Sequence, residues 1–115
     1  MIFVIDDDRM MAECIKGACK DFEVRIFGDA ISAMEEISDG AIPSLIFLDI
    51  LLDGPDGFTF LNEMASYSDT VKVPIVVVSS LDFANKNLSN YGVVGVLNKD
   101  NMMPEDILTY AEKYS

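Results

Sequence analysis

The stretch that determines the fold reads LIFLDILLDGPDGF and runs from Leu45 to Phe58. It begins as an unbroken apolar run, reaches a carboxylate at Asp49, and then turns through Gly, Pro and Gly. A short apolar run bounded by turn residues is typical of a strand that is buried on both faces of a parallel sheet. Asp49 would then lie at the carboxyl end of this strand, which is where open α/β sheets bind their ligands.

The size and charge of the chain limit the classes of protein to which it can belong. Its 115 residues, half of them apolar, are enough for one globular domain, which we expect to cover residues 1–115. The net charge of −12 argues against binding to nucleic acid or to an anionic membrane, because both require basic surface. No apolar run approaches the roughly 20 residues that span a bilayer, and the first residues show no secretory signal pattern. We therefore expect a cytoplasmic protein.

The histidine and cysteine content excludes several kinds of catalytic site. The chain contains no histidine, which removes His–Asp and His–Cys catalytic pairs and nearly all zinc chemistry. Cys14 and Cys19 are five residues apart within a helical pattern, which fits neither a CxxC site nor a disulfide framework. We expect both cysteines to pack in the core.

Strand-like and helix-like segments alternate along the chain. Short apolar runs predict five strands, at residues 2–5, 23–27, 45–49, 75–78 and 93–97. Helical spacing predicts five helices, at residues 11–22, 31–39 (marked by Ile31, Met34 and Ile37), 58–65, 82–91 and 104–114. Strict alternation predicts an α/β fold, a doubly wound parallel sheet with helices on both faces.

Functional-looking side chains follow four of the predicted strands. Asp6–Asp8 follow the first strand, Asp49 ends the third, Ser79 follows the fourth and Lys99 follows the fifth. Each alone is more often a helix cap, a turn or a surface residue, but all four would lie along one edge of the sheet. Carboxylates so close repel one another unless a cation is present, and an all-oxygen site suits Mg²⁺. With a lysine and a hydroxyl nearby, the predicted chemistry is phosphoryl transfer to a carboxylate.

Five short motifs carry a family resemblance. They are Val4-Ile5-Asp6-Asp7, Phe47-Leu48-Asp49, Asp56-Gly57-Phe58, Val77-Val78-Ser79-Ser80 and Lys99. Together they resemble the receiver domain of two-component response regulators, in the chemotaxis-regulator-like superfamily, over the whole chain. The resemblance implies a flavodoxin-like, three-layer fold with five parallel strands in the order 2-1-3-4-5. It also implies a phosphoacceptor signalling domain that catalyses only its own phosphorylation and dephosphorylation.

The resemblance implies a role for each acid at the sheet edge. Asp49 would accept a phosphoryl group from a histidine on a sensor kinase or a phosphotransfer protein. Mg²⁺ would be held by Asp6, Asp7, Asp49 and the backbone carbonyl of Leu51. Asp8 has no such role, and we expect it to cap the first helix.

The resemblance also implies how a phosphoryl group would change the surface. Lys99 would pair with Asp49 at rest and with the phosphoryl group afterwards, while Ser79 and Ser80 would bind the phosphoryl oxygens and carry the signal. The helix at residues 82–91 has few apolar anchors and is a plausible bistable element. The face formed by the fourth helix, the fifth strand and the fifth helix would then contact a downstream protein or effector domain, or a second copy of the chain.

The sequence departs from the family pattern near the lysine. Asp100 follows Lys99 where the family usually has proline, so that the Lys99–Asp100 peptide could be cis or trans. Val96 occupies the position of the family's aromatic switch residue. These departures leave open an atypical receiver that acts through protein contacts without phosphorylation. A haloacid-dehalogenase-like phosphatase with Asp6 as nucleophile is a weaker alternative, because its core and cap exceed 115 residues.

Overall fold

The strands form a single parallel sheet in the predicted order. The computed structural model describes residues 1–50, 57–80 and 91–115. Its five strands are β1 (Ile2–Ile5), β2 (Val24–Phe27), β3 (Leu45–Asp49), β4 (Ile75–Ser79) and β5 (Val93–Asn98). They are arranged as β2-β1-β3-β4-β5, which confirms the flavodoxin-like order. The apolar run at β3 is therefore the central strand, and all five of its residues are buried.

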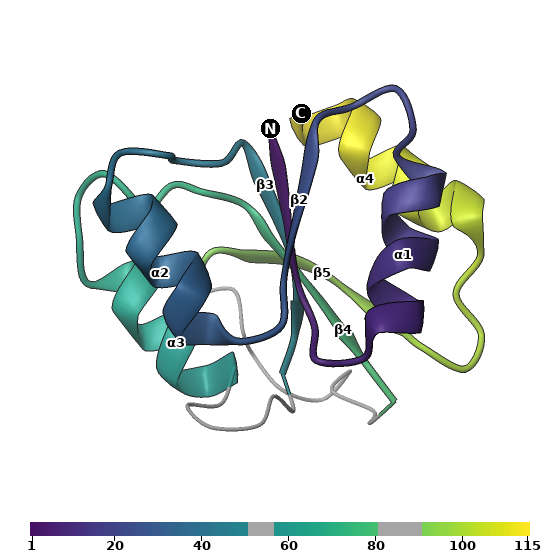
Figure 1. Ribbon diagram of the computed structural model, residues 1–115, viewed down its shortest axis with the longest axis horizontal. Coiled ribbons are helices and arrows are strands. Elements are labelled where there is room, and N and C mark those ends of the chain that lie inside the picture. Colours follow the sequence, from purple (N-terminus) through teal and green to yellow (C-terminus); the bar gives the residue numbers. More distant parts are fainter. Residues whose placement is uncertain (51–56, 81–90) are drawn as a thin grey trace.

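Helices cover both faces of this sheet. The described helices are α1 (Arg9–Ala18), α2 (Ala30–Ser38), α3 (Gly57–Ala65) and α4 (Pro104–Tyr114). Helices α2 and α3 lie on one face, and α1 and α4 lie on the other (Figure 1). The helix predicted at residues 82–91 lies outside the described residues except for Tyr91. None of the described helices is long and apolar enough to cross a membrane.

The alternation of side chains along each strand divides the core into two layers. Phe3 and Leu48 belong to the layer beneath α2 and α3. Val4 and Phe47 belong to the layer beneath α1 and α4. Because successive strand residues point to opposite faces, a strand covered on both sides must be apolar throughout. This requirement explains why β1 and β3 carry continuous apolar runs that end abruptly in carboxylates.

Side-chain caps determine where two of the helices begin. Asp8 accepts a hydrogen bond from the backbone N–H of Met11 at 3.2 Å, which confirms the predicted cap of α1. Asp29 accepts one from the N–H of Ser32 at 2.7 Å and caps α2 in the same way. The cap at Asp8 fixes the direction of the chain immediately after Asp6, where β1 ends.

Two helical faces differ from the sequence prediction. Cys19 is buried as predicted, but Cys14 is exposed, so the prediction of core packing was wrong for Cys14. Helix α1 buries Ile15, and the preceding residue is turned about 100° away around the helix axis. Helix α2 buries small residues such as Ala33, whereas Ile31, one of the residues that marked this helix, is 52% exposed.

Candidate functional site

Strand register brings the predicted site residues to one edge of the sheet. Ile5 of β1 pairs with Leu48 of β3, so that Asp6 and Asp49 follow at the same level on neighbouring strands. Asp49 in turn pairs with Val78 of β4, one residue before Ser79. The four motifs at the strand ends are thus adjacent because the sheet is parallel and in register.

Three aspartates at this edge form a compact cluster. One carboxylate oxygen from each of Asp6, Asp7 and Asp49 lies within 4.8 Å of the others. Asp6 is 2% exposed and Asp49 is 5% exposed, whereas Asp7 faces solvent. The backbone N–H of Asp8 donates to Oδ1 of Asp6 at 2.9 Å and holds this carboxylate in place. The cluster therefore has a rigid buried side and an open side.

Lys99 is the cation of the site. Its Nζ atom lies 3.0 Å from Oδ2 of Asp6 and 3.2 Å from Oδ2 of Asp49. The backbone N–H of Lys99 donates to the carbonyl oxygen of Ser79 at 2.9 Å, which ties the start of the loop after β5 to the end of β4. No peptide bond is cis in the described parts of the chain, so the Lys99–Asp100 bond is trans.

The sequence analysis did not single out Asn98, which shapes this loop. Its side-chain Oδ1 accepts a hydrogen bond from the N–H of Asp100 at 2.8 Å, and its backbone carbonyl accepts one from the N–H of Met102 at 2.9 Å. Asparagine at the start of a turn commonly makes such local bonds. Asn98 thereby shapes the turn that presents the lysine without a proline.

Burial and charge perturb both sides of the ion pair. Burial, more than any other influence, raises the pKa of Asp6 above its ordinary value, although Lys99 partly opposes this. Burial alone would lower the pKa of Lys99, but the two carboxylates outweigh it and raise that pKa. At an effective dielectric constant of about 20, two like charges 4.8 Å apart repel by about 3.5 kcal/mol. One ammonium shared by Asp6 and Asp49 offsets this repulsion, and a divalent cation would offset more of it.

The donor set fits a hard divalent cation. The oxygens of Asp6, Asp7 and Asp49 are all carboxylate oxygens, which suit Mg²⁺ better than thiolate- or imidazole-binding metals. Oδ2 of Asp6 is buried beside the ammonium of Lys99, 3.0 Å away, and a carboxylate oxygen has a second lone pair that it can offer to a metal. The cluster could therefore hold a metal. The fourth predicted ligand, the carbonyl of Leu51, lies outside the described residues.

The remaining predicted residues lie along β4 and β5. Ser79 is 1% exposed at the end of β4, and Ser80 is exposed immediately after it. Val96 lies on β5 beside Val77 and is 38% exposed. Tyr91 is partly buried and packs against the core layer beneath α2 and α3. The described structure therefore places a small aliphatic side chain, and no aromatic ring, at position 96.

The fold and the acidic edge with its lysine define the class of protein. The family model of the response regulator receiver domain matches residues 2–112. The chain belongs to this family, as its motifs predicted, and it is therefore a signalling domain.

Known proteins are similar to this chain along most of its length. It is 29% identical over 91 residues to response regulator Rcp1 of Synechocystis, covering 74% of this chain and 62% of that protein. The chain thus spans less than two thirds of the length of this curated relative. The receiver domain of NtrX from Brucella abortus is 29% identical with a TM-score of 0.84, covering 99% of this chain and 97% of that one. Chemotaxis response regulator CheY4 of Vibrio cholerae, at 20% identity, has the same fold, with a TM-score of 0.84 and coverage of 99% and 97%.

Proposed function

We propose that Asp49 is the phosphoacceptor of a two-component phosphorelay and takes its phosphoryl group from a histidine on a sensor kinase or a phosphotransfer protein. One observation carries this proposal: Lys99 lies within 3.2 Å of two buried carboxylates, Asp6 and Asp49, at the carboxyl edge of the sheet. A structural ion pair needs only one acid. A second buried carboxylate beside the same ammonium is expensive to keep unless it has a chemical role.

The transfer requires an oxygen nucleophile and groups that neutralise the negative charge of the phosphoryl oxygens. An oxygen of Asp49 would attack phosphorus, the bond from phosphorus to the histidine nitrogen would break, and the imidazole would take up a proton. Lys99 is close enough to Asp49 to move onto a phosphoryl oxygen in the product. Ser79, at the end of the adjacent strand, and Ser80 after it would donate hydroxyl hydrogen bonds to the phosphoryl oxygens and signal its presence.

The acid cluster would bind the metal ion that this reaction needs. Asp6, Asp7 and Asp49 would hold Mg²⁺ together with the carbonyl of Leu51, and the ion would balance the charge of the phosphoryl oxygens. The exposed side of the cluster, at Asp7, leaves room for the waters that Mg²⁺ usually keeps. The same residues would support the domain's own phosphorylation from small phosphodonors and its own dephosphorylation.

The surroundings of the site suggest how the signal leaves the domain. We propose that the protein works in the cytoplasm and that residues 1–115 form a single receiver domain. Its downstream partner would be a protein or an effector domain, because a net charge of −12 disfavours direct contact with nucleic acid or membrane. Contact with that partner, or with a second copy, would use β5, α4 and the predicted helix at residues 82–91.

Incubation with acetyl phosphate and Mg²⁺, followed by intact-mass measurement, tests the proposal. The wild-type chain should gain one phosphoryl mass, and the gain should disappear with EDTA or in Asp49→Asn. Asp100→Asn, which removes an exposed acid one residue from Lys99, should still be phosphorylated. A chain that gains no phosphoryl mass from any donor would instead be the atypical receiver that acts through contacts alone. Phosphate on Asp6 would indicate the phosphatase-like alternative.

A further inference from the structure

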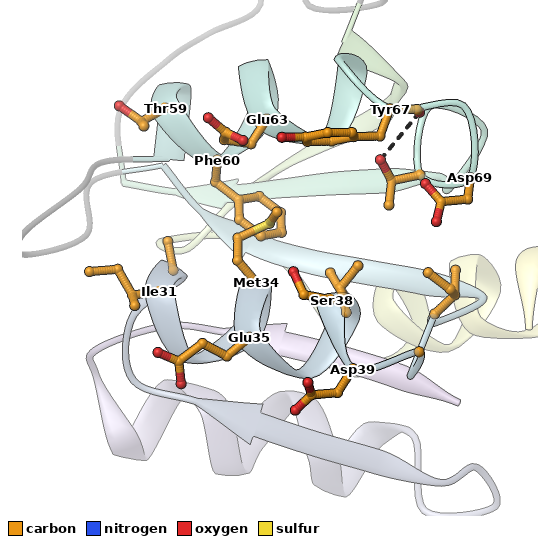
Figure 2. A pocket seen from close by; sticks show the side chains of 15 residues that line it. Ile31, Met34, Glu35, Ser38, Asp39, Thr59, Phe60, Glu63, Tyr67 and Asp69 are labelled. Carbon is orange, nitrogen blue, oxygen red and sulfur yellow. Dashed lines mark hydrogen bonds between the residues drawn. The ribbon is translucent and has the colours of Figure 1, made fainter.

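A groove separates α2 from α3 on the face of the sheet opposite α1 and α4. It encloses about 870 Å³, and none of the side chains of the acidic edge line it. Met34 of α2 and Phe60 of α3 meet at its floor, and Ile31 and Tyr67 stand along its walls (Figure 2). This groove is therefore a feature separate from the site at Asp49.

Several large apolar side chains of the groove are exposed. Ile31 is 52% exposed, Tyr67 is 54% exposed and Ile42 is 36% exposed, and all three line the groove. Helix α2 buries its alanines and Ile37 against the sheet, whereas Ile31 and Met34 line the groove. Large apolar side chains that gather in one exposed depression are typical of a protein interaction site.

Carboxylates surround this apolar surface on both sides. Glu35 lies on α2 and Asp39 directly follows that helix, while Glu63 lies on α3 and Asp69 in the turn after it. No lysine or arginine occurs among the described residues that line the groove. Of the nearby bases, Arg25 pairs with Glu36 outside the groove, at 3.2 Å. The groove thus combines an apolar floor with a rim whose charged side chains, among the described residues, are all acidic.

We infer that the groove between α2 and α3 binds a basic amphipathic helix of a partner protein. The apolar stripe of such a helix, spaced at i, i+3, i+4 and i+7, would cover Ile31, Met34 and Tyr67. Lysines or arginines beside the stripe would face the acidic rim on both sides. Helices α2 and α3 have nine residues each, or about 13.5 Å, which matches about two and a half turns of a bound helix and exceeds the roughly 10.5 Å between i and i+7.

The charge of the rim distinguishes this partner from a second copy of the chain. A symmetric dimer through the groove would bring the acidic rim of one copy against the acidic rim of the other, and like charges across an interface oppose association. The inference does not depend on the chemistry at Asp49. Asp49→Asn should therefore bind the same helix with unchanged affinity.

The test uses the whole chain and a labelled model peptide. The peptide has about 14 residues, with leucines at i, i+3, i+4 and i+7 and lysines beside them, and binding is followed by fluorescence anisotropy at low salt. Tyr67→Ser and Glu63→Lys should each weaken binding by at least about tenfold. Met10→Ser and Glu23→Lys are the matched controls, because both residues are exposed, neither lines the groove and neither lies on β5 or α4. These controls should change affinity by less than about twofold.

Four results would overturn the inference. Absence of saturable binding would do so, as would equal losses in Glu63→Lys and Glu23→Lys, which would indicate general attraction to an acidic protein. Equal binding of a peptide with glutamates in place of the lysines would remove the role of the rim. A dimer of the chain alone that Tyr67→Ser converts to a monomer would assign the groove to a second copy. Circular dichroism of each variant confirms that the exposed substitutions leave the fold intact.

Discussion

Replacing Lys99 by methionine tests whether its ammonium group allows two buried carboxylates to lie side by side. The ammonium lies 3.0 Å from Asp6 and 3.2 Å from Asp49, which are 2% and 5% exposed. Removing one partner of a buried ion pair costs about 3–5 kcal/mol. Because the lysine side chain is 15% exposed, water can replace part of its effect. We expect Lys99→Met to lower the free energy of unfolding by about 3 kcal/mol near neutral pH without Mg²⁺.

The assay is urea unfolding followed by circular dichroism, with and without Mg²⁺. Lys113→Met is the matched control, because Lys113 is exposed in the last turn of α4 and its contact in the described structure is the ring of Tyr114, at 5.4 Å. This control should lose less than about 1 kcal/mol. Mg²⁺ should stabilise Lys99→Met more than the wild type, because the ion replaces the missing charge. If Lys99→Met loses no more stability than Lys113→Met, the ammonium does not have the role that we assign to it.

The pH dependence of the same variant has a defined sign. The folded-state pKa of Asp6 is raised above its ordinary value of 3.8, so ionisation of Asp6 weakens the fold as pH rises through the folded pKa. Lys99 opposes that rise, and its removal raises the pKa of Asp6 further. The stability difference between wild type and Lys99→Met should therefore be small below about pH 4 and grow toward neutral pH.

Other features of the structure give three further predictions. Gly57→Ala would place a Cβ atom 2.5 Å from the backbone of Ile50, so thermal unfolding should show that the free energy of unfolding falls by about 1–3 kcal/mol. Gly17→Ala, in open space on α1, should stabilise the fold slightly. Asp8→Ala removes the cap of α1 and should lower the free energy of unfolding by about 1 kcal/mol in urea titrations. Maleimide labelling near neutral pH should modify the exposed Cys14 and spare Cys19, because burial raises the pKa of the Cys19 thiol to about 11. Equal labelling of the two cysteines would contradict the burial of Cys19.

The sequence predicts best those parts of the fold where few arrangements can bury the apolar residues. The continuous apolar runs in β1 and β3 can be satisfied only inside a sheet covered on both faces, and carboxylates placed at the ends of these strands must then share one edge. The meeting of Asp6, Asp49 and Lys99 at one edge follows from this requirement, whereas the strand order that places β3 at the centre was implied by the family resemblance. Capping by Asp8 was predictable for a similar reason, because a helix that begins after a strand needs an acceptor for its first N–H groups.

The prediction failed where several packings satisfy the same pattern. A helical stripe shows that a helix forms, but the side chains that it buries depend on the space above the sheet. Helix α2 lies on the sheet through Ala33 and Ile37, so Ile31, on another side of the helix, is directed outward. Cys14 is exposed because Ile15 takes the inward position on α1. The groove between α2 and α3 depends on these choices and could not be predicted from residue spacing.

Fluorine NMR of a titration with beryllofluoride and Mg²⁺ tests the central claim most directly, because it detects phosphoryl-like binding without depending on the lifetime of an acyl phosphate. A site in which a metal and Lys99 support Asp49 should give resonances of bound beryllofluoride. These should require Mg²⁺ and should be absent in Asp49→Asn. Lack of any bound signal in the folded wild-type chain, or an unchanged signal in Asp49→Asn, would contradict the assignment of Asp49 as the phosphoacceptor.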